Sequence, residues 1–292
     1  MLIVFTVKDA NQLFGGCEGR QLLETLVGRQ EVQREYFVAG NWGTVQGSRY
    51  NIGTISPLLT STSKVWKYLK EREIQPVVKQ EEILSLLFTA KKKGTAIPFF
   101  SPWGPRYKKN SPIINDEDLE IKTLQEIRSL FAGIKSKGYE IDFVLMPADL
   151  YGTTINNLSS LFVRQYFNSL RERAVSNLGD VCTLCVKPWS AFKREREVKY
   201  ITLREKIEAE FSTFISDAQF EKAFETAKVF NPANAYGSAW NYCVERVIEA
   251  LLIEEIYSPI KLSLVRKEKD DLDGPLKRMY MIKNKAPWLG GD

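Results

Sequence analysis

A short loop after an apolar run gathers side chains that could do chemistry. Residues 98–109, PFFSPWGPRYKK, bring a serine hydroxyl, two aromatic rings and several cations together. Ser101 is predicted to act there as a nucleophile or a positioning group. The cations suit a phosphate or a carboxylate. A rigid turn with a core-filling tryptophan and solvated cations is the alternative. The residues predicted to bind substrate in this loop are Trp103, Arg106, Tyr107 and Lys108.

A second polar segment, PADLYGTT at 147–154, follows another apolar run. Asp149 could hold an ammonium group or act as a general base, and Tyr151 could add a hydrogen bond to the substrate. Aspartate is also a common residue at the start of a helix, so capping is the alternative. The segment therefore indicates either a binding site or a helix start.

A tyrosine and two glutamates share one face of a helix expected over 235–255. Tyr242, Glu245 and Glu249 stand at i, i+3 and i+7. Tyr242 and Glu245 are predicted to be catalytic, because a tyrosine beside a carboxylate can move protons without histidine. Ordinary solvation of a polar helix face is the alternative.

Basic residues alternate near the C-terminus, in IKLSLVRK. Lys261 and Arg266 are predicted to bind an anionic co-substrate. An edge strand with outward lysine and serine explains the same alternation.

The chain has no histidine. This excludes Ser-His-Asp and Cys-His catalysis and histidine-bound metals. We expect no metal and no cofactor. Four cysteines do not form a disulfide framework in a chain of 292 residues. The pair Cys182 and Cys185 could bind zinc, but its apolar surroundings favour a buried strand.

Strands and helices alternate from about residue 95. An apolar run at 95–100 precedes an amphipathic helix at 119–134, and a second run at 141–146 precedes a helix at 158–174. This order predicts an α/β fold, a Rossmann-like, mainly parallel sheet with helices on both faces. Because ligands bind at the carboxyl edge of such sheets, the loops holding Ser101 and Asp149 should face one another.

The chain is expected to divide into an N-terminal α+β extension over 1–90 and a Rossmann-like catalytic domain over 91–292. The net charge of +5 is mild, and no apolar stretch is long enough for a membrane helix. A cytoplasmic location without membrane contact is therefore expected. The sequence leaves the oligomeric state open.

Several segments, taken in order, resemble the isonitrile synthase and dityrosine/pyoverdine biosynthesis family. They are a strand entering a Ser-Pro loop, an acidic-started helix, a strand ending in aspartate, a later tyrosine, a Leu-Ser strand and a Pro-Trp pair. The chain departs from that family at Phe100 and Trp103, where a basic residue and an asparagine are usual, and in two missing histidines. The matching segments are IPFFSPWG (97–104), 119–134, FVLMPAD (143–149), Tyr166, IKLSLVR (260–266) and APW (286–288).

Two segments also resemble the tRNA-dependent cyclodipeptide synthases. FFSPWG (99–104) is similar to the element whose serine takes an aminoacyl group from tRNA, and YCVERVIEALLIEE (242–255) to a helix that supplies Tyr and Glu. The family's Tyr and Glu stand four apart, whereas Tyr242 and Glu245 stand three apart.

Three functions follow from these observations. The first is an isonitrile-synthase-like enzyme that makes a secondary metabolite from an amino acid and an anionic co-substrate. The second is a cyclodipeptide-synthase-like transferase that uses aminoacyl-tRNA, with Ser101 as nucleophile. The third is a non-catalytic ligand-binding domain.

Overall fold

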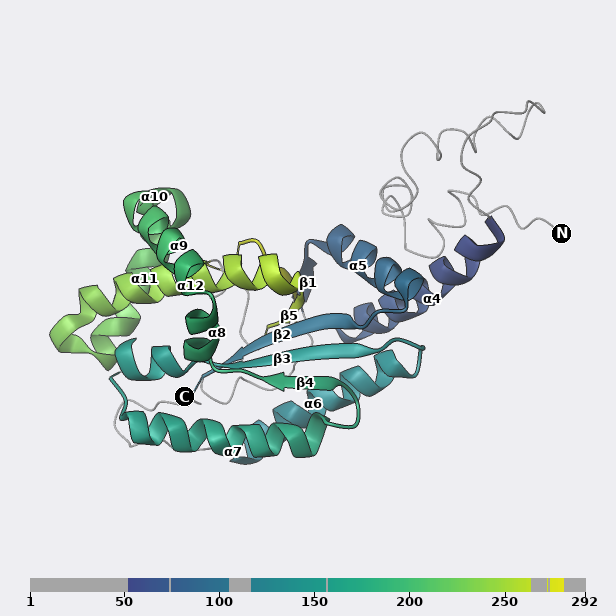
Figure 1. Cartoon of the computed structure of the whole chain (residues 1–292), viewed down its shortest axis with the longest axis horizontal. Helices are drawn as coiled ribbons and strands as arrows, with labels where there is room; N and C mark the ends of the chain where they lie inside the picture. Colours follow the sequence, from purple (N-terminus) through teal and green to yellow (C-terminus); the bar gives the residue numbers. More distant parts are fainter. Residues whose placement is uncertain are drawn as a thin grey trace, which may run out of the picture. The chain divides into compact units, whose positions relative to one another are not determined.

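The computed structural model describes residues 52–73, 75–104, 117–155, 157–263, 272 and 274–280. They form an α/β structure around a parallel sheet, which confirms the predicted fold class (Figure 1). The helices are α4 (Ile52–Arg72), α5 (Gln80–Lys93), α6 (Glu117–Lys135), α7 (Ser160–Leu178), α8 (Trp189–Glu195), α9 (Glu197–Ala209), α10 (Phe211–Phe214), α11 (Asp217–Phe230) and α12 (Ala235–Tyr257). A π-helical turn, η1 (Tyr151–Ile155), and a 3₁₀ turn, η2 (Pro232–Asn234), complete the helical elements described.

The sheet has the strand order β1-β6-β5-β2-β3-β4. Its strands are β1 (Gln75–Val78), β2 (Ile97–Trp103), β3 (Ile141–Pro147), β4 (Thr183–Val186), β5 (Ile260–Leu262) and β6 (Lys277–Tyr280). The pairs β2–β5, β3–β4 and β5–β6 are parallel. Their carboxyl ends therefore lie at one edge of the sheet, as predicted.

Helices cover both faces of the sheet. On one face, the Phe131 ring of α6 lies 5.1 Å from the rings of Phe99 and Phe143. On the other, Phe100 and Val144 belong to a buried apolar cluster with residues of α8, α9 and α12. Neighbouring residues of a strand point to opposite faces, so β2 and β3 need apolar side chains on both. This requirement explains the near-continuous apolar runs in their sequences.

The chain divides into two compact units. The described part of the first covers 52–73, 77–97 and 133–140, and the second includes 98–132 and 141–263. Within the first unit, α4 and α5 bury apolar side chains such as Leu69 and Leu87. Gly94, at φ 65°, ends α5 in the left-handed conformation that glycine adopts without strain. The first unit thus has an apolar core of its own.

One sequence interpretation of the C-terminal half is wrong. The edge-strand interpretation of Lys261 and Ser263 fails, because β5 lies between β2 and β6 and both side chains are 2% exposed. The segment 187–200 is helical, and its Trp189, Phe192 and Tyr200 side chains are buried whereas residues 194–198 are exposed.

The strand predicted around Cys182 and Cys185 is present as β4, but the prediction that both cysteines are buried is wrong. β4 is the last strand of the sheet, where Cys185 is exposed and Cys182 is half-buried. In the described part of the chain, no helix is long and apolar enough to cross a membrane.

Candidate active site at the carboxyl edge of the sheet

Three chain segments meet where the strands end. The Ala148 amide, after β3, donates to the Trp103 carbonyl of β2 at 2.7 Å. The Lys187 amide, after β4, donates to the Leu145 carbonyl of β3 at 3.1 Å. Figure 1 shows α8 next to the point where these strands converge. The two loops that the sequence singles out therefore leave the sheet side by side.

Ser101 belongs to β2 rather than to the predicted loop after it, and it is fully buried. Because it alternates with Phe100 along the strand, it lies on the α6 face of the sheet with Phe99. Its hydroxyl is 3.3 Å from the Leu262 carbonyl and 3.4 Å from the Pro102 carbonyl. Both distances exceed the usual 2.5–3.0 Å of an O–H···O bond. These weak bonds leave the hydroxyl able to turn toward another acceptor.

Asp149 binds the start of α8. Its two carboxylate oxygens accept from Ser190, one from the backbone amide at 3.0 Å and the other from the hydroxyl. Asp149 thereby caps a helix that begins forty residues further along the chain, whereas the sequence suggested a cap on its own helix. Both oxygens that would hold a substrate ammonium group are engaged.

Trp103 belongs to a buried polar cluster between the sheet, α6 and α7, the sealed network. Its indole N–H donates to the Tyr166 hydroxyl at 3.1 Å. That hydroxyl donates to Glu120 and lies 3.1 Å from the Gly104 carbonyl. Arg173 binds the other Glu120 oxygen at 2.5 Å, and the Glu120 side chain is 1% exposed. Trp103 thus fixes the end of β2 from within the core.

Glu245 lies at the centre of a second cluster, between α8, α9 and α12, which we call the open network. The Trp189 indole donates to Oε2 at 2.9 Å. Oε1 accepts from Tyr200, from Arg204 at 3.2 Å and from Lys193 at 3.3 Å. The side chains of Arg204 and Lys193 are 30% and 29% exposed. Through these four donors Glu245 holds the three helices together.

Glu249, one turn further along α12, is bound more simply. Its Oε2 accepts from the Tyr151 hydroxyl at 2.7 Å and its Oε1 from Arg246 at 2.8 Å. The Tyr242 ring meets the Tyr151 ring edge-on, with centroids 5.8 Å apart. Burial, reinforced by the Glu249 charge, raises the pKa of Tyr151 well above 10. Tyr151 thus stays protonated and donates its hydrogen bond to Glu249, a residue that the sequence placed on this face but did not assign.

Lys261 is buried on the α12 face of the sheet. It pairs in register with Phe100 of β2 and with Arg278 of β6, and paired residues point to the same face. A buried lysine suits an anion, as the sequence analysis predicts for this residue. The other residues predicted to bind substrate lie outside the described residues; they are Arg106, Tyr107, Lys108 and Arg266.

The open network could not be found from local sequence patterns. Trp189, Tyr200 and Glu245 come from three helices, and only the folded chain brings them together. The spacing of Trp189, Phe192 and Tyr200 was a usable signal, because it places aromatic side chains on one side of a charged helical segment. Cys243, beside Tyr242, adds no nucleophile, since burial raises the pKa of its thiol to about 12. The described residues hold no group of three or more His, Cys, Asp or Glu that could bind a metal ion.

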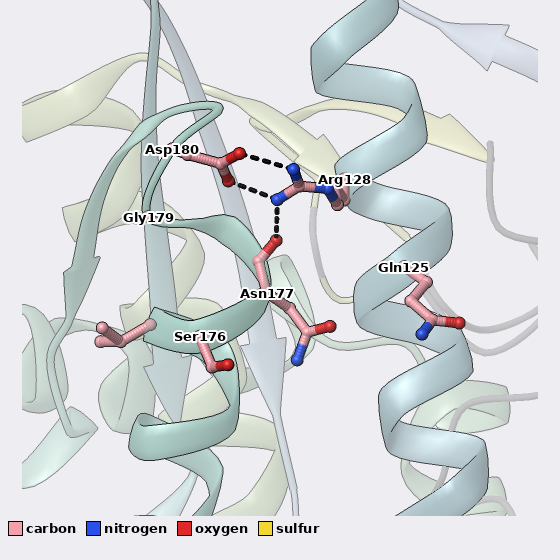
Figure 2. A pocket seen from close by; sticks show the side chains of 7 residues that line it. Gln125, Arg128, Ser176, Asn177, Gly179 and Asp180 are labelled. Carbon is pink, nitrogen blue, oxygen red and sulfur yellow. Dashed lines mark hydrogen bonds and ion pairs between the residues drawn. The ribbon is translucent and has the colours of Figure 1, made fainter.

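A shallow hollow of about 560 Å³ lies away from these residues, between α6 and the end of α7 (Figure 2). Arg128 spans it, binding both carboxylate oxygens of Asp180 and, at 2.8 Å, the Asn177 carbonyl. The ion pair is exposed and neutralises Arg128, the cation among the described lining residues. The described lining therefore offers no unpaired charge for chemistry.

Comparisons with known proteins give a weak likeness among solved structures. No protein-family model matches the chain, and no curated protein matches it. The isonitrile-synthase resemblance receives no support from these comparisons. Among solved structures, the chain is similar to a cyclodipeptide synthase (CDPS) from Fluoribacter dumoffii, with a TM-score of 0.37 and 12% identity over 62% of this chain and 88% of that one.

Proposed function

We propose that this protein is a transferase that takes an aminoacyl group from tRNA onto Ser101. The observation that carries the proposal is the Tyr151–Glu249 hydrogen bond, with Tyr242 packed against it. It supplies buried groups for proton transfer at the carboxyl edge of the sheet, in a chain without histidine. Acyl transfer through a serine needs such groups, and needs neither imidazole nor metal.

The geometry of Asp149 favours this reaction over the isonitrile-synthase reaction. The isonitrile-synthase reaction would require Asp149 to bind the amino group of a free amino acid. Ser190 already binds both carboxylate oxygens, so an ammonium group would have to share Asp149 with the start of α8. Transfer to Ser101 makes no such demand.

In the proposed step, the Ser101 oxygen attacks the ester carbonyl of aminoacyl-tRNA. A new ester forms on Ser101, the bond to the terminal ribose oxygen breaks, and that oxygen leaves as a hydroxyl. Tyr242, Tyr151 and Glu249 are the groups that would carry the serine proton to the leaving oxygen. Ser101 is buried on the α6 face, so its reaction with the groups of the α12 face requires the end of β2 and the segments around it to move.

The test is capture of the acyl-enzyme. The purified protein is incubated with tRNA charged with radiolabelled amino acids, denatured, and examined for label and for added mass on Ser101. Ser101→Ala should abolish the label, whereas Ser176→Ala, an exposed serine of α7, should retain it. Label that persists in folded Ser101→Ala, or wild-type protein that takes none from any charged tRNA, refutes the proposal.

A further inference from the structure

The first unit carries a strong positive charge. Its described residues, 52–73, 77–97 and 133–140, include ten lysines and arginines against five glutamates. This small part of the chain therefore accounts for a net charge of +5, equal to that of the whole chain. Such an asymmetry indicates an anionic partner for this unit.

A hollow of about 570 Å³ lies within this charged unit, between α4 and the turn after α6. Lys64, Lys137, Thr60, Ser61 and Ser136 line it. Pro57 is the other described residue of the lining, which includes no carboxylate among the described residues. Lysines with serine and threonine hydroxyls are typical contacts for phosphate oxygens.

Contacts between α4, α5 and the turn after α6 hold several of the cations near the hollow, while Lys70, Lys79 and Lys135 pair with glutamates of the same unit. The Lys137 ammonium lies 4.1 Å from the centroid of the Tyr68 ring, and the Arg72 guanidinium 4.8 Å from it. Gly133 permits this arrangement, because a Cβ there would lie 1.9 Å from the Tyr68 hydroxyl oxygen. Lys91, at the end of α5, donates to the Gly138 carbonyl at 2.7 Å. Two helices and a turn thus hold their basic side chains side by side.

We infer that this surface binds the phosphate backbone of RNA. Two lysines and three hydroxyl residues line the hollow, a composition that suits a phosphate group. The cations extend well beyond the hollow, over α4, α5 and the turn, so they match a series of phosphates rather than one. Most of them are lysines, which bind phosphate as point charges and fit recognition without sequence preference. The inference deepens the proposed function, on which it rests for the identification of the RNA as tRNA.

The experiment measures binding of fluorescently labelled, unfractionated, uncharged tRNA to the full chain at several salt concentrations. Lys64→Gln/Lys137→Gln should weaken binding about tenfold or more at 0.1 M salt. It should also reduce the slope of log K against log salt by about 2. Lys64→Arg/Lys137→Arg, which keeps both positive charges, should retain the wild-type affinity and the wild-type slope. Lys206→Gln/Lys222→Gln, which removes the same charge from exposed positions on α9 and α11, should change neither.

Unchanged affinity and slope in a folded Lys64→Gln/Lys137→Gln protein would overturn the inference. Polyglutamate that competes as well as tRNA would overturn the choice of RNA over an acidic polypeptide. The proposed function fails separately: wild-type protein that binds tRNA through this surface but never forms an acyl-enzyme refutes the transfer reaction alone. Ser101 acylation that survives the double substitution refutes the surface alone.

Discussion

The two faces of the sheet hold polar clusters built from the same four residue types. The sealed network joins Trp103, Glu120, Tyr166 and Arg173, and the open network joins tryptophan, tyrosine and arginine to Glu245. The carboxylates differ in exposure, at 1% for Glu120 and 9% for Glu245, and the arginines differ more, at 15% for Arg173 and 30% for Arg204. The same four residue types are thus shielded from water in the sealed network and partly exposed to water in the open network.

The difference in exposure distinguishes a network that stabilises the fold from one that lies beside the proposed chemistry. A sealed ion pair depends on its partner, because removing one member leaves a buried charge that water cannot reach. Water can solvate part of the open network, which also has Lys193 as a second cation. Tyr151 and Glu249 lie on the same side of the sheet as the open network, and in the proposed reaction they supply the proton-transfer groups. We therefore assign stability to the sealed network on the α6–α7 face and the proton-transfer groups to the α12 face, which Ser101 reaches only around the carboxyl edge of the sheet.

The largest expected effect is on stability. Arg173→Met should reduce the free energy of unfolding by about 3–5 kcal/mol, since Glu120 would remain buried and charged. Arg204→Met should cost about 1 kcal/mol or less, because Lys193 and water compensate Glu245. Urea unfolding of both variants measures the difference. Equal losses would show that the two networks do not differ in the way their exposure indicates.

The second prediction concerns activity. Tyr151→Phe should lower the rate of Ser101 acylation about 100-fold or more, the range in which a positioned proton donor contributes. Tyr166→Phe, in the sealed network, should leave the rate nearly unchanged in protein that remains folded. Single-turnover acylation at saturating charged tRNA provides the measurement. A reversed order would move the chemistry to the α6–α7 face.

The strongly periodic elements could be predicted from the sequence, and the cross-chain contacts could not. Apolar spacing in the sequence predicts β2, α6, β3, α7 and α12. The order of these elements predicts the parallel sheet. The role of Asp149 depends on Ser190, forty residues away, which no local pattern indicates. Lys261 alternates with apolar residues as an exposed edge would, yet strands on both sides bury it. Pattern reasoning assumes that polar residues face water, and it fails where polar residues meet each other in the core.

The third prediction concerns stability at alkaline pH. Burial and the nearby carboxylates of Glu249 and Glu120 raise the pKa values of Tyr151 and Tyr166 well above 10. In the unfolded chain both titrate near 10, so their contribution to stability is complete below pH 10 and is lost as pH rises above it. Each should reduce the unfolding free energy by about 1.4 kcal/mol per pH unit in that range.

Urea unfolding between pH 9 and 11 tests this expectation, with Tyr151→Phe and Tyr166→Phe as variants whose decline should be shallower. Tyr236, which is exposed, provides the matched control, and Tyr236→Phe should decline like the wild type. If all four proteins lose stability in parallel, neither buried tyrosine retains its proton in the folded state as described.

The smallest expected effect concerns Asp149, which connects the end of β3 to the helix that carries Trp189 of the open network. Asp149→Ala removes the cap at the start of α8 and should cost about 1 kcal/mol of unfolding free energy. Because Ser190 follows Trp189, the loss should also loosen the indole that binds Glu245, which tryptophan fluorescence can report. Ser190→Ala should reproduce part of the effect. If Asp149→Ala instead leaves stability intact and raises the concentration of free amino acid needed for binding, Asp149 is a substrate ligand. The isonitrile-synthase reaction would then be preferred to acyl transfer.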